Sequence, residues 1–375
     1  MKLEMDKYNR NVFDVSFTPI LKGFAIILMF FLHILSPGVL SRPEKIVDFT
    51  INGQYLSSYL ALSGNICIGI FAFITGYGWA GNFDQKTYAE RIYRPHGGVY
   101  YLFYVAMFLF CFPVRGICWY IETGELLKIS LKDAIFGLTA YHSESVFYGW
   151  YVYFYAMAVL TYKLFKALFD RVHLKNDILN ILFILAVFLT GRIFSRIIFR
   201  NLFHYDICTS VSSHYFQWMP VVMLGTYTYQ YSLFEKIDRI LFSKPYYEKA
   251  QHTSNWRKTL AGVFIFLGLF CAKSLFQGIT GNYSNFDSFI IIPFMYALIL
   301  IAKGLYSKLI GKAIAFIGTL STFMWFAHCV LRYEPFNGWL CMLRFPIFIL
   351  IAGIIVMMPI SYLLLKASQL LVQKG

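Results

Sequence analysis

The chain has 375 residues, of which 58% are hydrophobic and only 14% charged, and its mean hydropathy is +0.59. These values lie outside the range of soluble globular domains and favour a protein that sits in lipid. The net charge of +14 requires no nucleic-acid partner, because basic loops beside anionic membrane lipids account for it. The seven cysteines have no metal-type spacing, so we expect no metal.

Long apolar stretches recur along the sequence and predict about ten membrane-spanning helices. Because the hydrocarbon core offers no water to backbone groups, the fold class is all-α, a polytopic transmembrane helix bundle. We expect one integral membrane domain over residues 1–375 and no separate soluble domain. The predicted spans are 19–36, 56–80, 97–113, 146–165, 177–199, 214–232, 259–278, 287–303, 313–331 and 345–366.

The basic residues predict the orientation of these spans. If the spans alternate, the N and C termini share the side that holds most of the 33 Lys and Arg, which is the cytoplasmic side. The first span lacks a small-residue cleavage site after it and is expected to be retained. Residues 115–141 include a short interfacial or re-entrant stretch, and 235–257 form an irregular cytoplasmic loop. We expect a multi-pass protein of a bacterial cell (inner or plasma) membrane.

The first span carries two ionisable side chains in an apolar run. Lys22 and His33 lie eleven residues apart, which places them on one helix face and about 16 Å apart along the axis. Ionisable groups in lipid are costly and usually face the interior of the bundle, where they have a function. The alternative is a histidine hydrogen-bonded to a neighbouring helix and a lysine that reaches the headgroups, and the first helix alone favours neither.

Five segments in chain order resemble the acyltransferase-3 family of polytopic membrane enzymes. The first is the Lys22 to His33 run, where the family more often has arginine at the basic position. The others are Ile68–Tyr77, in which Thr75 replaces the usual serine, then 91–94, with the sequence Arg-Ile-Tyr-Arg, then Tyr148–Tyr151, and Gly318–His328. This ordered set, spread over residues 20–330, is far more specific than any one of its members.

The resemblance implies an acyl-CoA-dependent O-acyltransferase, and acetyl-CoA is the expected donor. The acetyl group would pass from the cytoplasm to a hydroxyl of an extracytoplasmic polysaccharide or lipid-linked glycan. His33 would remove the hydroxyl proton as general base, with Lys22 as its partner in the catalytic helix. Lys22, Arg91 and Arg94 would hold the donor's phosphates, although an isolated pair of arginines indicates only cytoplasmic charge.

Further residues are candidates for binding the acceptor. His328 should reach the same depth as His33, although a packed histidine is the commoner case. Trp150 and Tyr151 could stack on a sugar or belong to the aromatic belt at the membrane surface. The stripe Arg192, Arg196 and Arg200 must face polar groups. An acidic or phosphorylated acceptor fits it as well as lipid headgroups or a partner carboxylate do.

Several alternatives stay open at this point. The donor could be succinyl-CoA or another acyl-CoA, and the histidine could carry the acyl group covalently instead of acting as a base. A sugar or lipid transporter or flippase is the rival from another class, which intramembrane carboxylates would favour. A catalytically silent assembly partner is a third possibility. The sequence does not predict the acceptor or the oligomeric state.

Overall fold

The computed structural model describes residues 12–51, 53–93, 100–128, 130–131, 135, 150–198, 206–242, 256–280 and 287–373. These residues are almost entirely helical, and the strands among them form one short antiparallel hairpin. The all-α prediction is therefore confirmed.

The long helices are α1 (Thr18–Leu35), α3 (Ile66–Asn82), α5 (Tyr100–Thr123), α7 (Trp150–Arg171), α8 (Asp177–Ile197), α9 (Asp206–Gln230), α11 (Trp256–Thr280), α12 (Asp287–Leu305), α13 (Leu309–Thr319) and α16 (Pro346–Gln373). The short elements are η1 (Val15–Phe17), η2 (Pro43–Lys45), β1 (Thr50–Ile51), β2 (Gln54–Tyr55), α2 (Leu56–Ala61), η3 (Leu62–Asn65), η4 (Phe83–Gln85), α4 (Tyr88–Tyr93), α10 (Leu233–Phe242), α14 (Ser321–Ala327), η7 (His328–Arg332) and α15 (Glu334–Cys341).

Within the described part of the chain, seven helices are long and apolar enough to cross a membrane, or eight if one bent pair counts as a span. Each of the seven helices, and the bent pair, overlaps a span that the sequence predicts. The bent pair is α13 with α14 and η7, which meet at 62° where a single helix over 313–331 was expected. The two other predicted spans correspond to α5 and α9, which fall outside that set; α9 is rich in hydroxyl and amide side chains.

Two connecting segments differ from expectation. Residues 233–242 form α10, an amphipathic helix, so the start of the predicted irregular loop is ordered by its buried residues Leu233 and Phe234. The segment expected to be interfacial begins as a continuation of α5, which ends at Thr123. The rest of both segments lies largely outside the described residues.

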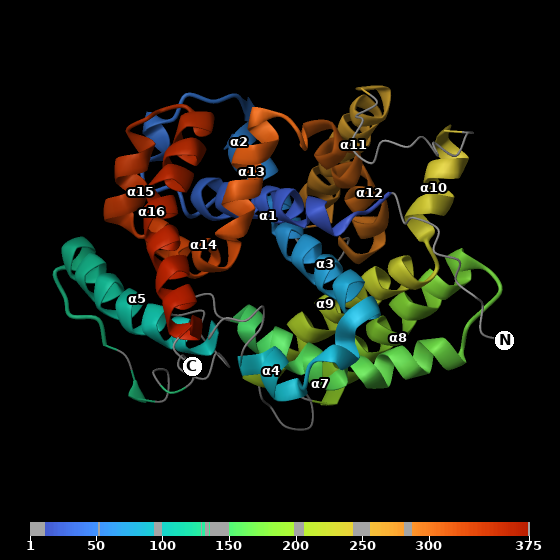
Figure 1. Ribbon diagram of the computed structural model, residues 1–375. Coiled ribbons are helices and arrows are strands. Elements are labelled where there is room, and N and C mark those ends of the chain that lie inside the picture. The colour runs from blue at the N-terminus through green and yellow to red at the C-terminus, as the bar shows by residue number, and fades with distance from the viewer. Residues whose placement is uncertain are drawn as a thin grey trace.

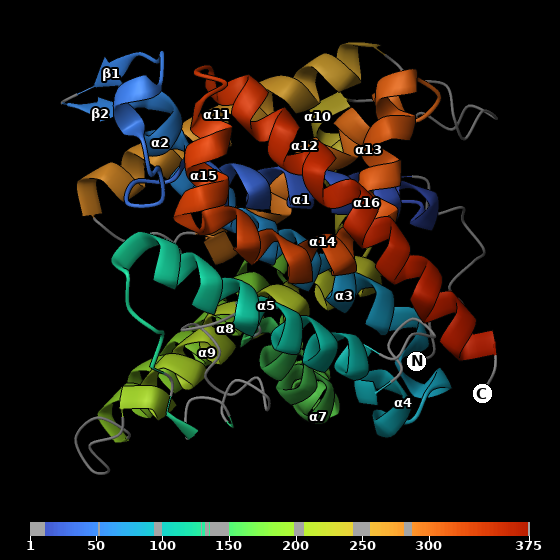
Figure 2. The ribbon, with the colours of Figure 1, turned by 90° about the vertical axis from the view of Figure 1, so that its left-hand side faces the viewer.

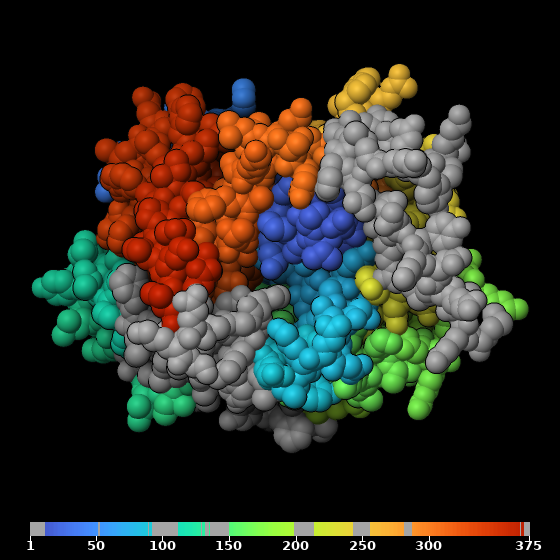
Figure 3. Space-filling view, in the orientation of Figure 1, coloured from blue at the N-terminus to red at the C-terminus, as the bar shows by residue number. Residues whose placement is uncertain are grey.

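Helix α1 lies at the centre of the bundle (Figure 1) and packs against α3, α12, α13, α14 and α16. On the face shown in Figure 3, the N-terminal part of the chain is visible as a blue patch beside the orange of α13. Ten of the 18 residues of α1 are buried, and the others are only partly exposed. A helix enclosed on most sides has little lipid contact, so polar groups on it face protein.

Glycines let α1 and α13 meet backbone to backbone. A Cβ on Gly23 would lie 2.1 Å from the Ile314 carbonyl oxygen, and one on Gly318 would lie 1.7 Å from the Pro19 carbonyl oxygen. In lipid, the hydrophobic effect does not drive helices together. Small residues at a crossing let the two backbones approach closely, so that van der Waals contacts hold them. The two glycines therefore fix the position of α1 against its neighbour.

A second close crossing joins α3 to α9. A Cβ on Gly76 would lie 1.8 Å from the Val222 carbonyl oxygen, and one on Gly225 would lie 2.3 Å from that of Phe73. The Thr226 hydroxyl donates a hydrogen bond to the Gly76 carbonyl over 3.0 Å. Gly76 belongs to Ile68–Tyr77, one of the segments that resemble the family. The absence of a side chain there lets α9 approach α3 closely.

A buried ion pair joins α11 to α12. Lys273 donates to Asp287, and both side chains are fully buried. The sequence placed Asp287 only at a helix edge, because it is the first residue of α12. Beside the pair, the Ser63 hydroxyl lies 2.6 Å from that of Ser274 and 2.8 Å from the Gln277 carbonyl oxygen.

The crossing of α3 and α9 predicts a steric effect at Gly76. Gly76→Ala is expected to lower the free energy of unfolding by about 1–3 kcal/mol, because the added methyl group overlaps the Val222 carbonyl. Gly78→Ala is the matched control, since no atom lies within 4 Å of a Cβ at that position on the same helix. Thermal unfolding in detergent measures both, and equal midpoints would contradict the assigned contact.

Candidate active site

Two histidine rings meet at one end of the central helix. His33 lies in the last turn of α1, and His328 is the first residue of η7, directly after α14. Their ring centroids are 4.6 Å apart with an interplanar angle of 39°. His33 is half-buried and His328 is buried. The prediction that both histidines reach the same depth agrees with this contact.

A backbone carbonyl orients the His328 ring. Its Nδ1 lies 2.5 Å from the Trp325 carbonyl oxygen, one helical turn earlier. A carbonyl can only accept, so Nδ1 carries the proton and, in the neutral ring, Nε2 carries the lone pair. This is the arrangement that a general base, or a residue that orients one, requires.

Aromatic side chains from three other helices form a group beside the histidine pair, and Trp325 of this group lies 6.3 Å from the His328 ring. The Trp325 ring packs against Phe71 of α3 at 5.6 Å and against Tyr151 of α7 at 5.2 Å. The Tyr151 hydroxyl hydrogen-bonds Thr75, whose own hydroxyl donates to the Phe71 carbonyl over 2.8 Å. Three of the sequence segments that were singled out therefore contact one another here.

Trp150 extends this aromatic group toward α9. Its ring stacks on His214 at 4.5 Å and 19° and lies 5.9 Å from Tyr151. His214 was not a predicted site residue; the only signal in the sequence was a histidine among polar residues at the start of a predicted span. The stacked pair connects the histidine site to the α7–α9 side of the bundle.

A buried asparagine holds the end of α1. The Asn337 side chain of α15 donates to the Ile34 carbonyl over 3.4 Å and accepts from the Ser41 backbone N–H over 2.9 Å. Asn337 thereby joins Ile34, the residue after His33, to the loop that follows α1 and to α15. Helix α15 lies near the β1–β2 hairpin and α2 (Figure 2). Asn337 is fully buried, so these bonds are shielded from solvent.

The structure also places an arginine near the histidines. Arg332, at the end of η7, lies within electrostatic range of His33 and also of Arg115 on α5. Both arginines are only partly buried. Arg332 therefore adds a positive charge near His33.

Arg192 lies on α8 near the end of α9 that carries His214. Gly191, beside it, meets the Phe216 ring of α9. Arg192 is half-buried and Arg196 is exposed, and the two lie within electrostatic range of each other. Arg200 lies outside the described residues. The role of this stripe in binding an acceptor stays a prediction.

The predicted donor residues lie away from the histidines. Lys22 is half-buried, three turns before His33 on α1, and it makes no ion pair or hydrogen bond within the described ranges. Arg94 lies outside those ranges. Arg91 lies in α4, next to the C-terminal end of α3. A ligand that joins Lys22 to His33 must extend about 16 Å.

The Arg91 guanidinium caps α3. Its Nε donates to the Phe83 carbonyl over 3.0 Å, and its Nη2 donates to the Asn82 and Phe83 carbonyls over 2.6 and 2.5 Å. The group also lies 4.4 Å from the centre of the Phe83 ring. Burial lowers the pKa of Arg91 from its ordinary value, because the charged form loses hydration. Its predicted contact with phosphates would use the remaining Nη1.

Taken together, these helices and side chains define a multi-pass membrane protein with an internal pair of histidines. The family model Acyl_transf_3, described as "Acyltransferase domain", matches residues 19–366. The chain therefore belongs to the acyltransferase-3 family and is a membrane acyltransferase. Comparisons with curated proteins and with solved structures gave no match.

The hydrogen bonds of Arg91 predict a loss of stability on substitution. Arg91→Lys loses bonds from a charged donor to the carbonyls of Asn82 and Phe83, so the free energy of unfolding should fall by about 1.5–3 kcal/mol. Arg239→Lys on the exposed face of α10 is the control for thermal unfolding. An unchanged midpoint with a raised KM for the acyl donor would show instead that Arg91 acts mainly on the donor.

The bonds of Asn337 predict an effect on both stability and rate. Asn337→Ala leaves the Ile34 carbonyl and the Ser41 N–H without this partner, which should cost about 1–3 kcal/mol. The shift of α1 should also reduce acyl transfer by up to about 100-fold. Phe336→Ala, an exposed neighbour, should have neither effect. Full activity in Asn337→Ala would contradict the role of Asn337 in positioning His33.

Proposed function

We propose that this protein transfers an acetyl group from cytoplasmic acetyl-CoA to a hydroxyl of an extracytoplasmic polysaccharide or lipid-linked glycan. The observation that carries the proposal is the pair of imidazoles 4.6 Å apart at the end of the central helix of an acyltransferase. A hydroxyl is a weak nucleophile near neutral pH, so transfer needs a base beside it.

His33 is the proposed base. It takes the proton of the acceptor hydroxyl as the oxygen forms a bond to the thioester carbonyl carbon. The C–S bond then breaks, and the proton passes from His33 to the departing thiolate, so that the ring ends neutral. His328, held by the Trp325 carbonyl, lies against His33 and supports its orientation. His328 is the alternative base, because its Nε2 carries the lone pair that this role requires. Substituting each histidine separately distinguishes the two assignments.

The acceptor is proposed to approach along the aromatic side chains. Tyr151 packs against Trp325, which lies next to His328, and Trp150 lies beside Tyr151. A sugar ring stacked there would bring a hydroxyl toward the histidines. The donor is proposed to approach from the end of the bundle that holds Lys22 and Arg91. The partly buried histidine site lies between the two approaches, and positioning supplies much of the rate.

Transport of a sugar or lipid is the competing function, and the buried Lys273–Asp287 pair is the observation that favours it. Ionisable groups inside a membrane often mark a substrate or ion path. The pair lies on α11 and α12, whereas the aromatic group that contacts the histidines comes from α3, α7 and α14. Substrate movement that survives loss of His33 would support transport; acyl transfer that depends on His33 supports the enzyme.

His33 predicts a large effect on rate with little effect on folding. His33→Gln should lower acyl transfer from acetyl-CoA by about 10²–10⁴-fold, since it removes the base and keeps a polar side chain of similar size. Purified protein in detergent or nanodiscs, with mass spectrometry of the acceptor, measures the product. Lys366→Gln on the exposed end of α16 is the control.

Three outcomes of such measurements would change the proposal. Activity retained in His33→Gln but lost in His328→Gln would move the base to His328. A wild-type protein that acylates its acceptor from succinyl-CoA and not from acetyl-CoA would overturn the proposed donor. Activity unchanged in both histidine variants would end the proposal for this site.

A further inference from the structure

Helix α10 lies at the end of the bundle that holds Arg91, and Figure 1 shows it in yellow at the edge of the molecule. A left-handed turn at Ser232, where φ is 50°, separates it from the end of α9. The Phe234 ring packs on Tyr77 of α3 at 6.4 Å and on Phe13 at 6.5 Å. Arg91 caps the end of α3 that follows Tyr77. Helix α10 is therefore next to the end at which the donor is proposed to approach.

One apolar face of α10 extends past the edge of the bundle. Its members recur at helical spacing and are Leu233, Phe234, Ile237, Ile240 and Leu241. Leu233 and Phe234 are buried, whereas Ile240 is 79% and Leu241 51% exposed. The bundle therefore covers the first turn of this face and leaves the last turn open to a partner.

The acidic side chains of α10 face the protein. Asp238 pairs with Lys258 of α11 over 2.7 Å and accepts a hydrogen bond from Tyr296 of α12 over 2.8 Å. One carboxylate oxygen of Glu235 is buried, and this carboxylate lies within electrostatic range of Lys303 on α12. The negative charges of α10 are therefore turned toward lysines of the bundle.

The exposed charged side chains that the structure describes in this region are basic. Arg239 is exposed and makes no ion pair or hydrogen bond with a described residue. Arg257, in the first turn of α11, is exposed as well, and its guanidinium lies 5.7 Å from the centre of the Trp256 ring. Trp256 is 66% exposed. Apolar, aromatic and basic side chains thus occur together here, which is the composition of a surface that binds anionic lipid.

The last turn of α10 lies level with the start of a membrane span. Asp238 pairs with Lys258, and the Lys258 ammonium lies 4.7 Å from the centre of the Phe242 ring. Lys258 is in the first turn of α11, which is long and apolar enough to cross a membrane. Tryptophan and basic residues at the end of a span occur at the depth of the lipid headgroups. These contacts place the exposed turn of α10 at that depth.

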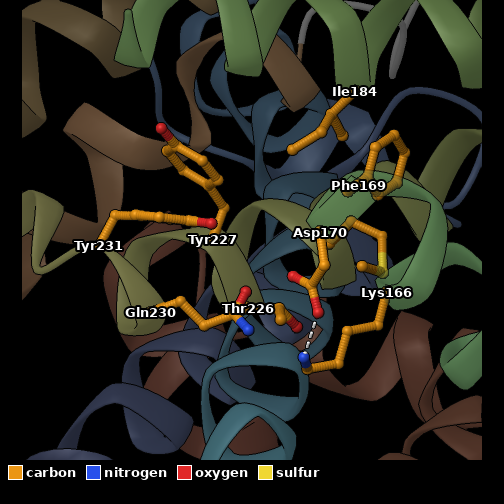
Figure 4. A pocket seen from close by; sticks show the side chains of 9 residues that line it. Lys166, Phe169, Asp170, Ile184, Thr226, Tyr227, Gln230 and Tyr231 are labelled. Carbon is orange, nitrogen blue, oxygen red and sulfur yellow. Dashed lines mark hydrogen bonds and ion pairs between the residues drawn. The ribbon is translucent and has the colours of Figure 1, made fainter. Parts of the chain in front are cut away.

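A second ion pair joins α10 to α8. Lys236 lies 2.7 Å from Asp177, the first residue of α8. Asp177 also accepts a hydrogen bond from Tyr227 of α9 over 2.6 Å, and Tyr227 lines the small hollow between α7, α8 and α9 in Figure 4. The position of α10 is thus fixed against α8 and α11 by charged groups.

We propose that α10 and the first turn of α11 bind anionic phospholipid at the membrane surface. The acyl chains would cover Ile240 and Leu241, and the headgroup phosphates would meet Arg239 and Arg257. Bound lipid would hold α10 in place and, through the two ion pairs of α10, the ends of α8 and α11. This binding requires no acyl transfer, so it does not depend on the proposed function.

Thermal unfolding of the full chain in mixed detergent micelles tests this site. Phosphatidylglycerol replaces phosphatidylcholine at constant total lipid, and the midpoint should rise because the anionic lipid binds the folded protein. In Arg239→Gln and in Arg257→Gln, the phosphatidylglycerol concentration that gives half of this rise should increase about fivefold, the contribution of one basic residue near a membrane surface. In phosphatidylcholine alone, both variants should unfold at the wild-type midpoint, because the two arginines are exposed.

The matched control is Arg171→Gln, which removes an exposed arginine from the last turn of α7, a helix that packs against α4 and its Arg91. Its response to phosphatidylglycerol should equal that of the wild-type protein. A loss as large as in the other two variants would show a general attraction to surface charge and overturn the site. An unchanged response in both Arg239→Gln and Arg257→Gln would overturn it as well.

Further comparisons separate membrane lipid from a soluble anion. Glycerol 3-phosphate carries the phosphate without acyl chains and should leave the midpoint unchanged, so a shift equal to that with phosphatidylglycerol overturns the assignment to lipid. Ile240→Ser combined with Leu241→Ser should raise the half-rise concentration of phosphatidylglycerol, because the acyl chains lose their apolar contact. A wild-type response in that double variant overturns the role of the apolar face.

Discussion

Everything at the histidine site depends on how closely α1 contacts its neighbours. Gly23 and Gly318 bring α1 against α13, and a Cβ on Gly64 of η3 would lie 2.4 Å from the Leu28 carbonyl of α1. In lipid these contacts are held by dispersion and close approach and not by exclusion of water. Because a helix is stiff, fixing it at Gly23 and Leu28 sets the direction in which His33 points. Asn337 then fixes the end of the same helix.

The partner ring is placed by a break in a helix. Helices α13 and α14 meet at 62°, so the chain that packs along α1 through Gly318 turns before it reaches His328. A straight helix over the same residues would carry His328 along the axis of α13. The bend instead places the centre of the His328 ring 4.6 Å from that of the His33 ring. It also brings Trp325 against Phe71 of α3 and Tyr151 of α7. The histidine pair thus depends on a break between α13 and α14, in a region where the sequence predicts one continuous helix.

The sequence predicts the spans and the depth of the two histidines, because apolar length and helical rise are local properties. The segments that resemble the family contain Thr75, Tyr151 and Trp325, and the contacts among these three residues follow from packing that no single segment contains. The sequence does not reveal the bonds that Arg91 makes to the end of α3, since the charge pattern alone cannot separate a cap from a phosphate ligand. Helix α10 was missed because its order comes from the burial of Leu233 and Phe234.

The Lys273–Asp287 pair has a place in the same chain of contacts. Lys273 and Asp287 satisfy each other's charge, and breaking such a buried pair costs about 3–5 kcal/mol. Next to Lys273, Ser274 and Gln277 of α11 hold Ser63 of η3. The following residue of η3, Gly64, is the one that contacts α1. The ion pair therefore lies next to the contact between η3 and α1, and it can stabilise the fold around the histidine site without touching a substrate.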